Sequence, residues 1–128
     1  MNTLSTNLPR SPDSVGAARR LVNGHTPSLD SQQRQDAALM VSELVTNAVR
    51  HTRSGRLAMV LYLEADGGWL RIEVHDADPH EPRQRQPGAL DESGFGLLLI
   101  EALAGKWGVE QTMTGKAVWA ELDARQVA

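Results

Sequence analysis

The chain of 128 residues contains no cysteine, which excludes disulfide bonds, thiolate zinc sites and cysteine nucleophiles. No segment approaches the roughly 18 consecutive apolar residues of a membrane-spanning helix, and residues 1–10 lack the apolar core of a secretion signal. The net charge of −3 gives no general case for binding nucleic acid. From these absences we expect a cytoplasmic protein that contacts neither membrane nor nucleic acid directly.

Aromatic residues are also scarce, at 4%, so leucine, valine, alanine and isoleucine must fill the core. The length suits a single domain over residues 1–128. Hydrophobic and turn patterns predict a short strand within 1–10, helices over 13–22 and from 30 or 31 to about 51, strands over 57–63 and 70–76, a loop over 79–93, a buried helix over 97–103, and strands over 107–113 and 116–122. This order predicts an α/β (α+β) fold, a two-layer sandwich with a mostly antiparallel sheet and helices on one face.

The helix expected to end near residue 51 carries an unusual line of polar residues. Glu43, Asn47 and His51 are spaced i, i+4, i+8, so they lie along one side of the helix. That side borders the apolar face, where a carboxylate and an amide are costly unless something pairs with them. Each residue also has a simpler interpretation. Glu43 is then a surface charge, Asn47 is an amide on the side of the helix, and His51 interacts with the helix dipole.

Two further places could carry chemistry, and each has a simpler structural interpretation. Asp76 ends a predicted strand, where it is either an exposed turn carboxylate or an acceptor for an amino group in a cleft. Gly94 and Gly96 precede a predicted helix, where they form either a helix-entry turn or a phosphate site made of backbone N–H groups. Spacing alone does not decide between these interpretations.

The combination of these features resembles the Bergerat-fold (GHKL) ATP-binding superfamily, over about residues 4–123. Residues 43–51 look like its N box, 75–78 occupy the place of its G1 box, 94–97 look like its G2 box, and 114–119 resemble its final Thr-Gly-Lys segment. The sequence from Val41 to Ala48 and the length of the chain are most similar to those of small bacterial anti-sigma-factor serine/threonine kinases of the RsbW/SpoIIAB kind. The chain departs from the family at the G1 box, where Asp78-Pro79 stands in place of the usual glycines.

The resemblance implies a role for each matching position. Asn47 would hold Mg²⁺ through its amide oxygen, and Glu43 would be the general base. Asp76 would accept from the adenine 6-amino group. Residues 79–93 would form an ATP lid. The other implied nucleotide-binding residues are His51, Asp78, Arg83, Arg85, Gly94, Phe95, Gly96, Leu97 and Thr114.

The implied function is phosphoryl transfer from ATP to a serine or threonine of a STAS-type anti-sigma-factor antagonist, by a protein that also binds a sigma factor. Homodimer formation is a further implication. Three alternatives stand beside this one. They are a nucleotide-dependent regulator that binds partners without phosphate transfer, the ATPase module of a sensor histidine kinase, and an α/β scaffold that binds no nucleotide. The altered G1 box favours the first alternative, and Glu43 favours the kinase.

Overall fold

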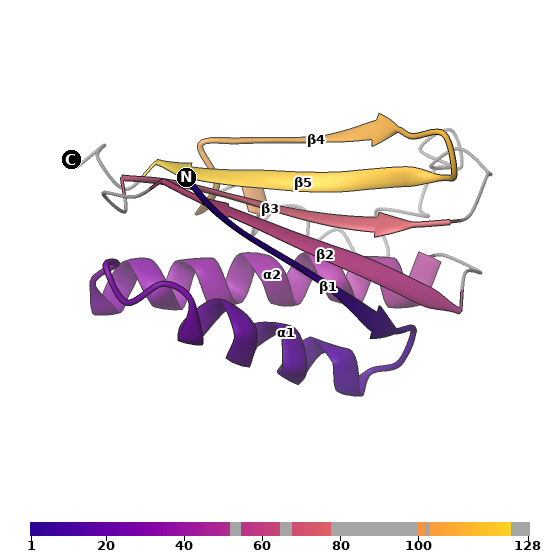
Figure 1. Ribbon diagram of the computed structural model, residues 1–128, viewed down its shortest axis with the longest axis horizontal. Helices are drawn as coiled ribbons and strands as arrows, with labels where there is room; N and C mark the ends of the chain where they lie inside the picture. Colours follow the sequence, from indigo (N-terminus) through magenta and orange to yellow (C-terminus); the bar gives the residue numbers. More distant parts are fainter. Residues whose placement is uncertain (52–54, 65–67, 78–99, 102, 124–128) are drawn as a thin grey trace.

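The computed structural model describes residues 1–51, 55–64, 68–77, 100–101 and 103–123, and all statements on structure concern these residues. Two helices lie side by side beneath one face of a sheet, so the molecule has two layers (Figure 1). This arrangement confirms the α/β sandwich that the sequence predicts. Within the described residues, no helix combines the length and apolar character needed to cross a membrane.

The helices α1 (Asp13–Gly24) and α2 (Ser31–His51) begin at polar residues, as the sequence predicts. At α2, Asp30 Oδ1 accepts from the Gln33 backbone N–H at 2.8 Å, and Gln33 Oε1 accepts from the Asp30 N–H at 2.9 Å. This reciprocal pair is a capping box, which satisfies two N–H groups that have no partner within the helix. At α1 the cap position is occupied by Pro12, and the Oγ of Ser11 accepts from the Asp13 N–H at 3.3 Å.

The sheet has the order β1-β2-β3-β5-β4, and each neighbouring pair is antiparallel. Its strands are β1 (Asn2–Pro9), β2 (Arg56–Leu63), β3 (Trp69–Asp76), β4 (Lys106–Gln111) and β5 (Lys116–Asp123). The predicted strand over 107–113 ends two residues early, because the Thr112 N–H donates to the Gly115 carbonyl and the Gly115 N–H donates to Thr112 Oγ1, both at 2.9 Å. This turn fixes the start of β5.

The core lies between α2 and the sheet. Alternation along β2 and β3 sends every second residue inward, and these side chains are almost fully buried. The apolar face of α2 packs on them. The core residues of these three elements include Met40, Val41, Leu44, Val45, Leu57, Met59, Leu61, Leu70, Ile72 and Val74. Burial of this face fixes the rotation of α2, and therefore the direction of the polar residues beside it.

The outer face of the sheet carries a charged cluster that the sequence patterns do not predict. Arg71 donates to Glu73 at 2.7 Å and to Glu121 at 2.9 Å, and its guanidinium lies 4.1 Å from the Trp119 ring centroid. Burial lowers the pKa of Arg71, but the hydrogen bonds and charges of Glu73 and Glu121 outweigh burial and raise it overall. Arg71 therefore links β3 to β5 as a permanent cation on the face away from the helices.

Candidate functional site

Three chain segments meet at one end of the molecule. The last turns of α2, the carboxyl end of β3 and the first residue of β5 all lie at the right-hand end of Figure 1. Asp76 ends β3, and Lys116, which begins β5, is its register partner across the two strands. Since α2 packs against both strands, the sheet and the helix supply polar groups to the same region.

A buried ion pair lies at this end of the molecule. Lys116 Nζ lies 3.0 Å from Asp76 Oδ2, and the side chains are only 10% and 3% exposed. Carboxylates and ammonium groups are seldom buried to this degree unless they are paired, because removing a charge from water is costly. The pair places two opposite charges in a nearly dry environment, which is unusual for a strand-end aspartate. The interpretation of Asp76 as an exposed turn carboxylate is therefore wrong.

Gly115 allows the two strands to approach closely beside this pair. A Cβ at this position would collide with the Asp76 carbonyl oxygen and would crowd the Ala77 Cα. The absence of a side chain at residue 115 is therefore a steric requirement of the site, set by the backbone of β3. Together with the turn at Thr112, it determines where Lys116 stands.

The polar line on α2 differs in burial along its length. Asn47 is buried, with 8% of its surface exposed, while Glu43 is partly exposed and His51 is exposed. An amide buried next to the core is the more unusual observation, because polar groups inside proteins nearly always have partners. His51 and Arg50 occupy the last turn of α2, where cations interact favourably with the helix dipole.

Other predicted site residues divide into two groups. Thr114 is described and exposed, next to Gly115 in the turn before β5. The remaining ones lie outside the described residues, so their roles stay predictions: Asp78, Arg83, Arg85, Gly94, Phe95, Gly96 and Leu97.

Lys116 has no role among the sequence-based predictions. Its position in the Thr-Gly-Lys segment marks it as unusual, but the pairing with Asp76 depends on β5 lying beside β3. These strands are separated by β4 in the sequence and are neighbours in the sheet. The alternation of residues along a strand shows which side chains face the core, but it does not show which strand is adjacent in the sheet.

The described part of the molecule thus combines a two-layer α/β sandwich with a buried amide on its helix and a buried carboxylate at the adjacent strand end. The chain belongs to the family of histidine kinase-like ATPase domains, whose sequence model matches residues 8–122. This is a nucleotide-using family of the GHKL type, as the motifs at residues 43–51 and 114–119 indicate.

Two relatives are similar in sequence. The serine-protein kinase RsbW of Oceanobacillus iheyensis is 31% identical over 116 residues, an alignment that covers 75% of this chain and 71% of the relative. An uncharacterized protein of Streptomyces coelicolor is 37% identical over 83 residues, which cover 63% of this chain and 79% of that protein. The chain is therefore RsbW-like within the wider family.

Two solved structures share the fold. The RsbU and RsbW domains of a Mycobacterium tuberculosis protein match all of this chain with a TM-score of 0.71 at 20% identity. The histidine kinase domain of a blue-light activated kinase from Erythrobacter litoralis matches 93% of it with a TM-score of 0.56 at 21% identity. This chain spans 35% and 63% of those two chains, respectively. At these identities the matches support the fold alone.

Proposed function

We propose that residues 1–128 form one ATP-binding domain that acts as an anti-sigma-factor-type regulator and phosphorylates a serine or threonine of a STAS-type antagonist. The observation that carries the proposal is the buried Asp76–Lys116 pair at the end of the sheet against which α2 packs. A buried charge at a strand end, beside a helix with a buried amide, is expected where a polar ligand binds.

Asp76 is the group we assign to purine recognition. An ionised carboxylate has about four acceptor positions, so the bond from Lys116 is compatible with a second bond from the adenine 6-amino group. Lys116 then has a positioning role, because it holds the Asp76 carboxylate in one rotamer. Thr114 and His51 also lie at this end of the molecule. We assign Thr114 to the surroundings of the adenine base and His51 to the surroundings of the phosphates.

Asn47 is the residue we assign to Mg²⁺. Its buried amide supplies a neutral oxygen of the type that Mg²⁺ binds, and an oxygen ligand next to a core becomes favourable once it has a partner. The metal would neutralise phosphate charge when bound. By resemblance, the lid over 79–93 with Asp78, Arg83 and Arg85, and the segment Gly94, Phe95, Gly96 and Leu97, would complete the phosphate site.

Glu43 is the residue we assign to proton transfer. It lies one turn before Asn47 on the same side of α2, and it is partly exposed, so an incoming hydroxyl can reach it. As the bond between the hydroxyl oxygen and the γ-phosphorus forms, the bond to the ADP oxygen breaks and Glu43 takes the hydroxyl proton. Positioning and charge neutralisation supply most of the remaining rate.

The assignment of protein kinase activity is supported by the RsbW relative, whose name describes a serine-protein kinase. A regulator of this type would act in the cytoplasm, with a sigma factor as a second partner and a homodimer as its assembly. A second candidate is a nucleotide-dependent regulator without transferase activity. Asp78-Pro79 in the G1 position favours it, since the flexible glycines of that box are absent.

The decisive experiment follows transfer of labelled phosphate from ATP, with Mg²⁺ present, to purified STAS-type antagonists of the source organism. Glu43→Gln is expected to reduce the transfer rate about 100-fold or more, while ATP affinity changes less than about threefold. The matched control is Asp36→Asn, which makes the same carboxylate-to-amide change about two turns earlier on α2 and should leave transfer unchanged. ATP binding without transfer to any antagonist would replace the kinase by the second candidate.

A further inference from the structure

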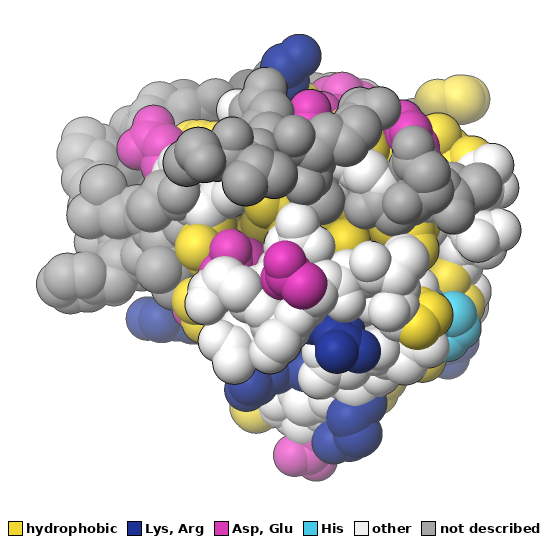
Figure 2. Space-filling view, turned by 90° about the vertical axis from the view of Figure 1, so that its left-hand side faces the viewer, with side chains coloured by type: hydrophobic (Ala, Val, Ile, Leu, Met, Phe, Trp, Pro, Cys, Tyr) yellow, Lys and Arg dark blue, Asp and Glu magenta, His cyan; other side chains and the backbone are white. Residues whose placement is uncertain are grey.

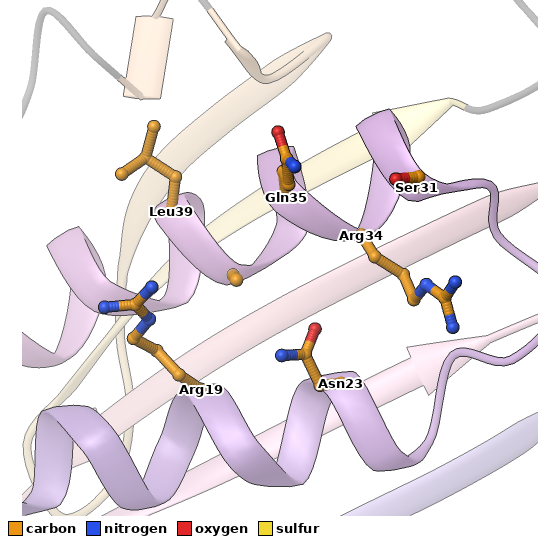
Figure 3. Close-up of a pocket in the computed structure, with 7 residues that line it drawn as sticks. Arg19, Asn23, Ser31, Arg34, Gln35 and Leu39 are labelled. Atoms are coloured by element: carbon orange, nitrogen blue, oxygen red, sulfur yellow. The ribbon is translucent and has the colours of Figure 1, made fainter.

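A groove of about 540 Å³ lies between α1 and α2, away from the Asp76–Lys116 end of the molecule. It is formed by the second half of α1 and the first half of α2. In Figure 3, Arg19 and Asn23 point from α1 toward α2, and Arg34 points from α2 toward α1. The full lining consists of Arg19, Asn23, Ser31, Arg34, Gln35, Ala38 and Leu39.

The charge of this groove is opposite to that of the whole chain. Arg19 and Arg34 line it and no aspartate or glutamate does, although the net charge of the chain is −3. Within the described residues, neither guanidinium takes part in an ion pair. Lys and Arg side chains also appear on the lower half of the face in Figure 2, where the helices lie. Each guanidinium can therefore donate hydrogen bonds to a ligand without breaking an existing ion pair.

The groove also has an apolar part. Ala38 lies buried in its lining, and Leu39 is 38% exposed, one of few large apolar side chains on the described surface. Interfaces between proteins commonly combine arginine with an apolar centre, and an amphipathic segment laid into a helical groove is a recurring mode of peptide recognition. A small anion would use the arginines and leave Leu39 in water.

We propose that this groove docks an acidic segment of a partner protein, with one apolar side chain on Ala38 and Leu39 and flanking carboxylates paired with Arg19 and Arg34. Carboxylates match the planar guanidinium fork through two parallel hydrogen bonds, so the pairing is directional as well as electrostatic. Because the groove is separate from the Asp76 end, docking does not require nucleotide. The arginine part of the groove is therefore separate from the residues assigned to phosphate transfer, and Leu39 lies one turn before Glu43 on α2.

The test begins with a displayed library of random 12-residue peptides, selected on the full chain without nucleotide. The selection includes depletion on the double variant Arg19→Glu/Arg34→Glu. We expect the surviving peptides to place Asp or Glu on both sides of a Leu, Ile, Met or Phe. Their affinity for each single variant should fall about tenfold or more, as expected for loss and reversal of a charge-assisted hydrogen bond.

Arg20→Glu is the matched control. Arg20 follows Arg19 in α1, is also exposed, and does not line the groove. The same charge reversal there should change peptide affinity less than about twofold if recognition is local, because exposed charges beyond contact distance are screened by salt. Leu39→Ala should weaken the apolar-centred peptides and leave binding of a poly-glutamate peptide unchanged.

Several outcomes would overturn the proposal. These are a selection without acidic enrichment, peptides that bind the double variant equally well, and an Arg20→Glu effect as large as that of Arg19→Glu. Poly-glutamate or citrate that competes as well as the selected peptides would indicate simple anion attraction. Thermal unfolding of each variant, and its ATP affinity, are measured in parallel, so that unfolding or failure of the nucleotide site is distinguished from loss of docking.

Discussion

Lys116 and Asp76 give the clearest energetic expectation at the scale of single residues. Removing one partner of a buried ion pair takes away much of the compensation of the other charge, and Asp76 is the more deeply buried of the two. Lys116→Met is therefore expected to lower the free energy of unfolding by about 3 kcal/mol. In a cycle with Asp76→Asn, the double variant should recover part of this loss through a coupling energy of about 1–3 kcal/mol.

Urea unfolding of the four proteins measures this coupling. A coupling energy near zero would mean that the pair contributes nothing beyond its separate residues. Lys106→Met controls for removal of a lysine as such, because Lys106 is exposed at the start of β4 and should change stability by less than about 0.5 kcal/mol.

At this scale the sequence marks candidate residues of the site and leaves their structural partners open. Glu43, Asn47 and Asp76 stand out because a polar residue beside an apolar face, or at a strand end, is a local signal. Lys116 and the pair Arg19/Arg34 do not, because each gains its importance from an element that is distant in the sequence. Arg19 faces Arg34 only after two helices have packed.

At the scale of elements, the turn before β5 makes a specific demand on Gly115. Gly115→Ala is expected to destabilise the protein by about 1–3 kcal/mol, because the new methyl group overlaps the Asp76 carbonyl and the strands must separate. Separation of the strands also displaces Lys116 from Asp76, so the variant should bind ATP more weakly than the unaltered protein. Thermal unfolding and ATP titration measure the two effects.

Gly24→Ala is the control at the end of α1, where a Cβ would meet no atom within 4 Å. Equal destabilisation by the two substitutions would contradict the steric explanation.

The elements themselves were largely predictable, since the 3.6-residue period of α2 and the alternation of β2 and β3 are strong local patterns. The end of β4 was placed too late, because Thr112 and Gly115 bond across the turn.

At the scale of the whole molecule, ligand binding should appear as added stability. ATP with Mg²⁺ at 100 times its dissociation constant adds about 2.7 kcal/mol to the free energy of unfolding, which raises the Tm of a domain of this size by several degrees. GTP should give a smaller shift, since the group at position 6 of guanine is an acceptor and faces the Asp76 carboxylate unfavourably.

Differential scanning fluorimetry with the two nucleotides makes this measurement. Asp76→Asn should remove the preference for ATP over GTP, and Asp36→Asn should preserve it. Equal shifts with both nucleotides in the unaltered protein would contradict the role of Asp76 in purine choice.

The fold as a whole was predictable from the order of helices and strands, whereas the placement of β5 between β3 and β4 was not.

That placement also governs the time course of folding. β2 and β3 are close in the sequence and can pair early, but β1 must find β2 across both helices, and β3 stays without its second neighbour until β5 arrives. Pairings of this kind close slowly, because chain entropy is lost before the contacts form. During synthesis Lys116 leaves the ribosome after β1, β2, β3, β4 and the helices α1 and α2, so the ion pair between Lys116 and Asp76 forms only after these elements have been made. The candidate nucleotide site therefore cannot be complete until β5 is paired with β3.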